Sequence, residues 1–450
     1  MAPVNEATGE GTAGERGQPG NEGASRTRTG GARLARAGGA GLRRAGVAGV
    51  AGAGCSAVAQ FALVVVVTRG FGAAEAGAFF ATTAAVLMAA GIAKLDAGNG
   101  LVYAIARRRA AGHHDISGYL RAALVPCVVA SCVGGAVLYP WVGTVAAALP
   151  VLVVGDVLLA ATRGLGTIRP TVLLDGVALP AAQVALVAGV AAAGAGEWLA
   201  VAWGLPYLPV MALAAAELRR GMPSAEPRGR GWELWRYTAP RSLAAGVQAV
   251  FQRLDVVIVA LLAGPAQAAV YTAATRFKVV GQLVNRGLAQ AAQARLVAAL
   301  ADGDRARAGE VYQTATAWLV VLTWPVWVAY AAAAPWVLRM FGPAYVTATP
   351  VALLLAGTMM VATACGMVDV VLTAAGHTGT SLLNLLAAIG CTLALDVALI
   401  PSHGALGAVA GWSGGVLVKN LLPLWQLHRR YGLRPFGRHT LRALRVRTAS

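Results

Sequence analysis

The chain has 450 residues, of which 57% are hydrophobic and only 12% are charged. Because soluble domains carry about 25% charged residues, this composition excludes an ordinary soluble protein and favours a polytopic α-helical membrane protein. The net charge of +18 comes mostly from arginines that lie between apolar runs. That distribution follows the positive-inside pattern of membrane proteins and argues against nucleic acid as a partner.

Residues 1–40 are rich in Gly, Ala and Arg and lack apolar periodicity, which predicts a disordered cytoplasmic tail. After this tail, apolar runs predict about twelve transmembrane helices. Their expected ranges are 45–67, 77–98, 119–138, 142–162, 170–192, 197–217, 239–262, 267–294, 312–334, 346–372, 380–400 and 405–427. An even number of spans puts both termini on one side, and the arginines of alternate loops predict that this side is the cytoplasm.

A polar segment with several Pro and Gly residues interrupts the spans after the sixth. We therefore expect a cytoplasmic linker at 218–236 between an N-terminal six-helix lobe, 41–217, and a C-terminal six-helix lobe, 237–428. Residues 429–450 form a basic cytoplasmic tail.

An internal repeat supports this division. The segment 65–79 aligns with 257–271, with Gly72 opposite Gly264, and each belongs to the first hairpin of its lobe. The same register pairs Lys94 with Arg286. Two matching segments of the same topology predict a parallel pseudo-repeat, whose lobes surround a central cavity and are related by an axis along the membrane normal.

The stretch 253–295 predicts two apolar helices on either side of a turn at Gly264 and Pro265. In the second helix, a stripe of polar side chains falls on one face at about 100° per residue. The stripe consists of Thr275, Lys278, Gln282, Asn285, Arg286 and Gln293. A cation at bilayer depth costs about 2.5–3.5 kcal/mol and normally faces a bundle interior or a wet cavity.

We therefore expect Lys278 and Arg286 to line a cationic lumen that faces the first lobe, with Lys94 and Arg253 as further candidates. Arg276 points away from the stripe and is expected to pair with another helix. The intramembrane acids are Asp96, Asp156, Asp175, Asp255, Asp369 and Asp396. No nucleophile–base motif, phosphate-binding loop or metal-ligand spacing stands out, so neither an enzyme nor a bound metal or cofactor is expected.

Short motifs resemble those of a known family. Arg253-Leu-Asp255, Gly264 and Tyr271-Thr-Ala-Ala-Thr-Arg276 resemble the R-x-D … G … Y-x-x-A-x-R signature of the Wzx-type oligosaccharide flippases. Phe341-Gly-Pro-Ala-Tyr345 resembles the (F/G)-G-x-x-Y segment of that family. The similarity covers most of residues 40–430, and the wider superfamily also contains lipid II flippases and multidrug extruders built from two six-helix lobes.

The resemblance implies a bacterial cytoplasmic-membrane flippase. It would move a polyprenyl-diphosphate-linked oligosaccharide from the inner to the outer leaflet by alternating access, for cell-surface polysaccharide synthesis. A cavity lined by Lys and Arg suits such an anionic substrate. A polysaccharide polymerase and glycosyltransferases would be partners, and coupling to H⁺ or Na⁺ through Asp255 or Asp369 stays open.

Two other functions remain open. A cation-coupled multidrug or toxin antiporter would use acids of the seventh and tenth spans, where this chain has Asp255 and Asp369. Its cationic cargo fits poorly in a basic lumen, and the first span, 45–67, contains no acid. A non-transporting membrane scaffold of a glycan-synthesis complex would not need the polar stripe.

Overall fold

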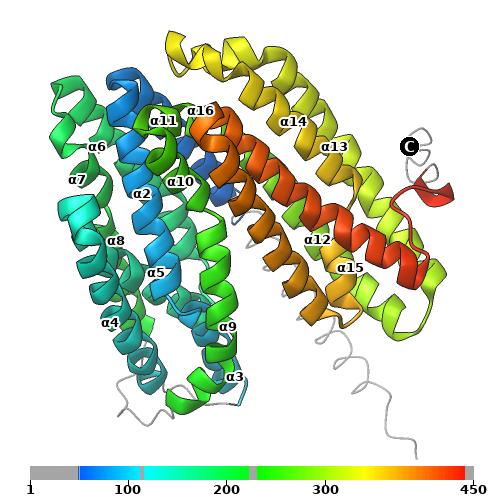
Figure 1. The fold of residues 1–450 in the computed structure, drawn as a ribbon. Coiled ribbons are helices and arrows are strands. Elements are labelled where there is room, and N and C mark those ends of the chain that lie inside the picture. The colour runs from blue at the N-terminus through cyan, green and yellow to red at the C-terminus, as the bar shows by residue number, and fades with distance from the viewer. Residues whose placement is uncertain (1–48, 50, 112–115, 222–230, 441–450) are drawn as a thin grey trace, which may run out of the picture. The chain divides into compact units, whose positions relative to one another are not determined.

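The computed structural model of the chain describes residues 49, 51–111, 116–221 and 231–440 (Figure 1). The predicted tail 1–40 and the end of the basic tail, 441–450, lie outside the described residues. The chain divides into two compact units, Met1–Ala51 and Gly52–Ser450, and the fold below is that of the second unit. Every regular element among the described residues is helical.

The helices follow one another with short connections. In order, they are Ala51–Gly70, α2 (Ala73–Ala93), α3 (Ala97–Ala110), α4 (Ser117–Val142), η1 (Gly143–Ala147), α5 (Ala148–Gly164), η2 (Thr171–Ala178), α6 (Leu179–Ala193), η3 (Gly196–Trp198), α7 (Leu199–Gly204), α8 (Tyr207–Gly221), α9 (Gly231–Phe251), α10 (Leu254–Ala263), α11 (Pro265–Thr275), α12 (Lys278–Ala301), α13 (Arg305–Arg339), η4 (Pro343–Ala348), α14 (Thr349–Ala364), α15 (Val368–Ala374) and α16 (Thr378–Tyr431).

The predicted fold class, a polytopic α-helical membrane protein, is confirmed. Eight helices of the described chain are long and apolar enough to cross a membrane, or nine if the bent pair Arg241–Phe251 and Leu254–Ala263 is one span. Two of the eight, Ser117–Gly164 and Thr378–Tyr431, have 48 and 54 residues, whereas one crossing needs about 20. Where the structure describes them, the twelve predicted ranges fall largely on helical residues. Fewer spans are counted by length because helices are joined at turns such as Gly404.

A bend divides the second predicted span. The expected span 77–98 stops at Ala93, and α3 continues past a bend in which Leu95 and Asp96 adopt left-handed φ angles of 50° and 53°. Residues other than Gly rarely adopt this backbone conformation, so the bend is strained unless other contacts stabilise it. Asp96 holds it by accepting hydrogen bonds from Asn99 Nδ2 at 2.6 Å and from Arg241 Nε of α9 at 2.8 Å.

The helices on either side of the predicted linker are longer than expected. α8 continues to Gly221 and α9 begins at Gly231, so both helices enter the range 218–236. The residues between them, 222–230, lie outside the described residues.

The two repeat segments form the same local structure. α2 begins directly after Gly72 and α11 directly after Gly264, as the alignment predicts. The two helices also pack against each other, and a Cβ atom added at Gly77 would lie only 1.6 Å from the carbonyl oxygen of Pro265. Only glycine permits this close approach of α2 to the start of α11.

Candidate functional site

A buried charge cluster joins the predicted stripe to α10. Asp255 stands in the first turn of α10, with 7% of its surface exposed. Its Oδ2 accepts a hydrogen bond from the Tyr271 hydroxyl at 2.6 Å and from Lys278 Nζ at 3.0 Å, and its Oδ1 accepts one from the Val256 amide at 2.9 Å. Lys278 Nζ also lies 4.9 Å from the ring centroid of Trp412, within cation–π range. We call Asp255, Tyr271, Lys278 and Trp412 the Asp255 cluster.

A second carboxylate lies beside this cluster. Asp396 is 1% exposed and lies in α16, which packs against α10, the helix of Asp255. Its Oδ1 is buried and has no hydrogen-bond partner among the described residues. Gly411, also in α16, packs so closely that an added Cβ would lie 2.0 Å from this oxygen. A buried carboxylate oxygen without a partner is costly and is typical of a functional position.

The structure changes the expected role of Lys278. Its ammonium group is bound to Asp255, a partner that the stripe does not predict, and its contact with substrate stays a prediction. The predicted second helix is interrupted between Thr275, where α11 ends, and Lys278, where α12 begins. Because the stripe is divided at this point, its members do not share one environment.

The other stripe residues confirm that division. Thr275 is buried, and its hydroxyl donates to the carbonyl oxygen of Tyr271 in its own helix at 2.8 Å. Asn285 and Gln293 are exposed on α12. The side chains of Gln282 and Arg286 lie outside the described residues.

Two arginines of the family-like signature have different surroundings. Arg276 Nη2 donates to Oε1 of Gln60 on the first helix at 2.9 Å, which confirms the expected pairing with another helix. Arg253 directly precedes α10 and is half-buried, and its guanidinium makes no hydrogen bond or ion pair with any described residue. Asp255 follows it two residues along the chain.

Lys94 lines a polar cavity of about 410 Å³ between α2, α3, α5, η2 and α9. It forms an ion pair with Asp156 of α5, and the two side chains are 33% and 36% exposed. The polar side chains of the lining are Lys94, Asp96, Asn99, Asp156, Arg163, Asp175, Gln248 and Gln252. The sequence identifies Asp156 and Asp175 as intramembrane acids but does not place them beside Lys94, and it assigns Arg163 to a loop.

Asp369 is not brought to Asp255 by any contact of the described residues. It lies in α15, half-buried, and accepts a hydrogen bond from the Ser381 hydroxyl. α16, which carries Asp396 in the eleventh predicted span, packs against α10, the helix of Asp255. The use of Asp255 and Asp369 by an antiporter stays a prediction.

The second family-like motif is structural. The ring of Phe341 is fully buried and packs edge-on against Phe61 of the first helix, with the centroids 5.4 Å apart. Gly342 has a φ of 133°, a conformation that favours glycine. Nearby, Arg69 at the end of the first helix donates to the carbonyl oxygen of Met340 at 2.8 Å. The motif thus joins the first helix to the end of α13.

Neither a family model nor a curated protein sequence matches the chain. Its structure is similar to a multidrug resistance MATE family transporter of the MOP superfamily in an inward-facing conformation, with a TM-score of 0.62, 18% identity, and 88% of this chain and 96% of that chain covered. It is also similar to the lipid II flippase MurJ in an inward closed conformation, with a TM-score of 0.63, 10% identity, and 86% and 90% of the two chains covered.

A MATE family transporter in an outward-facing conformation matches with a TM-score of 0.58 and 17% identity, over 87% of this chain and 95% of that chain. Identities this low establish the fold and leave the cargo open. The chain therefore has the fold of the MOP superfamily transporters.

Proposed function

We propose that this protein is a transporter that moves an anionic, lipid-linked saccharide across the bilayer by alternating access. The shared fold supports transport, since the similar proteins include multidrug transporters and a lipid II flippase. The observation that carries the choice of an anionic cargo is the environment of Arg253. This half-buried guanidinium has no hydrogen-bond partner among the described residues, and the chain carries further intramembrane cations at Lys94 and Arg276.

Three cations in neighbouring spans are unfavourable without an anion, because charges at bilayer depth are normally paired. Two cations near the cavity already have partners, since Lys94 binds Asp156 and Arg241 binds Asp96. Arg253, together with Arg163 of the cavity lining, is left for a ligand. A diphosphate supplies two or more charged acceptor oxygens that match the planar guanidinium donors.

The polar cavity suits the saccharide part of such a cargo. Asn99, Gln248 and Gln252 place amide groups in its lining, and amides can donate to and accept from sugar hydroxyls. In this proposal the polyprenyl chain stays in the bilayer, and synthesis of a cell-surface polysaccharide uses the exported unit. Glycosyltransferases and a polymerase are the partners that this route requires.

Asp396 favours a second candidate function, cation-coupled antiport. Its unpartnered oxygen beside Asp255 is an acceptor for H⁺ or Na⁺, and either ion could drive export of a drug as well as of a saccharide. We favour the lipid-linked cargo because a cationic drug would be repelled by Arg253.

Reconstitution in liposomes tests the proposal. We expect Arg253→Gln to slow translocation of a fluorescent polyprenyl-diphosphate saccharide at least about tenfold, since one charge-assisted hydrogen bond is worth about 1.5–3 kcal/mol. Arg121→Gln, on the exposed face of α4, is the matched control and should transport at the wild-type rate. Wild-type transport by Arg253→Gln, or drug–proton exchange without saccharide translocation, would overturn the proposal.

A further inference from the structure

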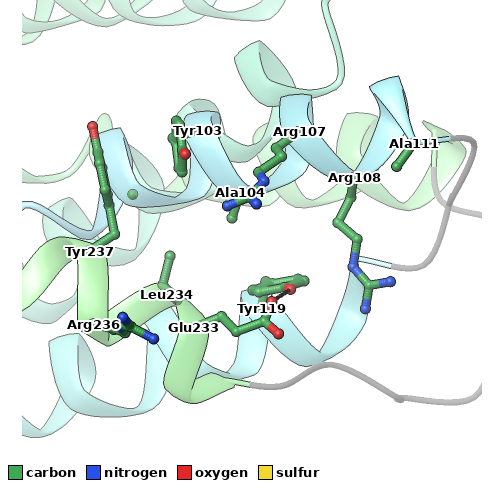
Figure 2. Close-up of a pocket in the computed structure, with 11 residues that line it drawn as sticks. Tyr103, Ala104, Arg107, Arg108, Ala111, Tyr119, Glu233, Leu234, Arg236 and Tyr237 are labelled. Atoms are coloured by element: carbon green, nitrogen blue, oxygen red, sulfur yellow. Dashed lines mark hydrogen bonds between the residues drawn. The ribbon is translucent and has the colours of Figure 1, made fainter.

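A second pocket lies outside the polar cavity. It has a volume of about 910 Å³ and is formed where the end of α3, the start of α4 and the start of α9 meet (Figure 2). This volume is within the range of about 300–1,000 Å³ that ligand pockets occupy. We call it the interfacial pocket. Its lining includes Tyr103, Arg107, Arg108, Glu233, Arg236 and Tyr237.

The walls of the interfacial pocket are fixed by hydrogen bonds. The Tyr119 hydroxyl of α4 donates to Glu233 Oε2 at 2.7 Å, and Trp235 Nε1 donates to the carbonyl oxygen of Ala122 at 2.9 Å, which together attach α9 to α4. Gly100 lets α3 approach α9, because a Cβ there would lie 2.2 Å from the Thr238 hydroxyl oxygen. The pocket is therefore built into the helix packing and does not depend on side-chain rearrangement.

The charge of the lining is positive. Arg107, Arg108 and Arg236 face one carboxylate, that of Glu233, which is already bound to Tyr119. Arg107 of α3 and Arg236 of α9 approach the pocket from two sides in Figure 2, and neither forms a hydrogen bond or ion pair with another described residue. Planar guanidinium groups converging from two helices match the geometry of a phosphate.

The aromatic side chains indicate the depth of the pocket in the membrane. The rings of Tyr103 and Tyr237 stack with centroids 4.3 Å apart and an angle of 11°, and 44% and 37% of these residues is exposed. Trp232 in the first turn of α9 is 77% exposed. Exposed Trp and Tyr beside a group of arginines at helix ends are typical of the level of the lipid headgroups.

We propose that the interfacial pocket binds the phosphate headgroup of a lipid, held by Arg107 and Arg236, with the Tyr103–Tyr237 pair as the wall that the headgroup contacts. An anionic phospholipid and a lipid-linked saccharide both carry this chemistry. The lipid site does not depend on the cargo proposed above. Transport by Arg253 variants tests the cargo, and lipid titration tests this site.

Titration of the purified full-length protein with soluble short-chain phosphatidylglycerol, followed by tryptophan fluorescence, tests this site. We expect the paired substitutions Arg107→Gln and Arg236→Gln to raise the Kd at least about tenfold, as the loss of charged hydrogen bonds requires. Arg121→Gln should leave the Kd unchanged. Ala104→Phe, which fills the pocket from α3 and keeps every charge, should also weaken binding and covers the case in which the double variant does not fold.

Two further probes identify the source of the phosphate. Competition by a short-chain polyprenyl-diphosphate saccharide at the same site would extend the proposal to the lipid-linked class, and its failure to compete would limit the site to phospholipid. Inorganic diphosphate binding as tightly as the lipid would overturn the proposal, because the site would then recognise a free anion. An unchanged Kd in both the double arginine variant and Ala104→Phe would overturn it as well.

Discussion

The Asp255 cluster and the polar cavity contain the same kinds of groups in different surroundings. Each has a lysine–aspartate ion pair in the membrane-spanning part of the chain. The side chains of Lys278 and Asp255 are 17% and 8% exposed, whereas those of Lys94 and Asp156 are 33% and 36% exposed. The first pair also has a tyrosine hydroxyl and two aromatic rings around it, and the second lines open space.

The difference in exposure suits the two ion pairs to different roles. A cavity that carries cargo must exchange its contacts with water and substrate, so its ion pairs have to be accessible and easily broken. A buried ion pair with its hydrogen bonds made is stable only while both partners are present. The gain or loss of one charge in such a pair therefore changes the protein's stability strongly. Under the proposed function, cargo would contact the polar cavity and Arg253, and Asp255 with Asp396 would serve the coupling step.

The largest loss of stability is expected when one partner of the buried Lys278–Asp255 pair is removed. Asp255→Asn leaves the Lys278 ammonium buried without its counter-charge, and breaking a buried pair costs about 3–5 kcal/mol. The added substitution Lys278→Met should restore most of this stability. Thermal unfolding of the purified protein, followed by tryptophan fluorescence, measures both.

If the stability losses of Asp255→Asn and Lys278→Met simply add in the double variant, the two groups are not coupled. The contrast between the Asp255 cluster and the polar cavity then fails. Equal losses for Asp255→Asn and Asp156→Asn would contradict it in the same way.

A smaller loss is expected when only the hydroxyl on Asp255 is removed. Tyr271→Phe deletes the 2.6 Å bond to a carboxylate, worth about 1.5–3 kcal/mol, and keeps the ring beside Lys278. Tyr330→Phe is a matched control, since its hydroxyl donates at 2.6 Å to the neutral carbonyl oxygen of Ala274 and should cost about 0.5–1.5 kcal/mol. Equal unfolding temperatures for the two variants would show that the charge of Asp255 contributes nothing.

The sequence predicts the helices better than the side-chain partners. Apolar runs determine where a chain can cross a bilayer, so the described parts of the predicted ranges are largely helical. The bend at Leu95 and Asp96 is not visible in the sequence, because the hydrogen bond that holds it comes from Arg241, far along the chain.

The same limit applies to the partner of Lys278. Helical periodicity orders residues around one axis, and it cannot show that α11 and α12 are divided or that α10 and α16 approach the division. The cost of an intramembrane cation correctly indicates that Lys278 must have a partner, but not whether that partner is substrate or Asp255. Pairing across helices depends on tertiary packing, which one sequence does not contain.

The smallest coupling energy is expected for the ion pair of the polar cavity. Lys94 and Asp156 are about one-third exposed, so their coupling should resemble that of an accessible ion pair, about 0–1 kcal/mol. A double-mutant cycle of Lys94→Met and Asp156→Asn, measured by thermal unfolding, gives this value. Raising the salt from about 0.1 M to about 1 M shortens the Debye length from about 10 Å to about 3 Å. The coupling of Lys94 and Asp156 should then fall while that of Lys278 and Asp255 stays constant, and the same salt response in both pairs would show that neither is protected from water.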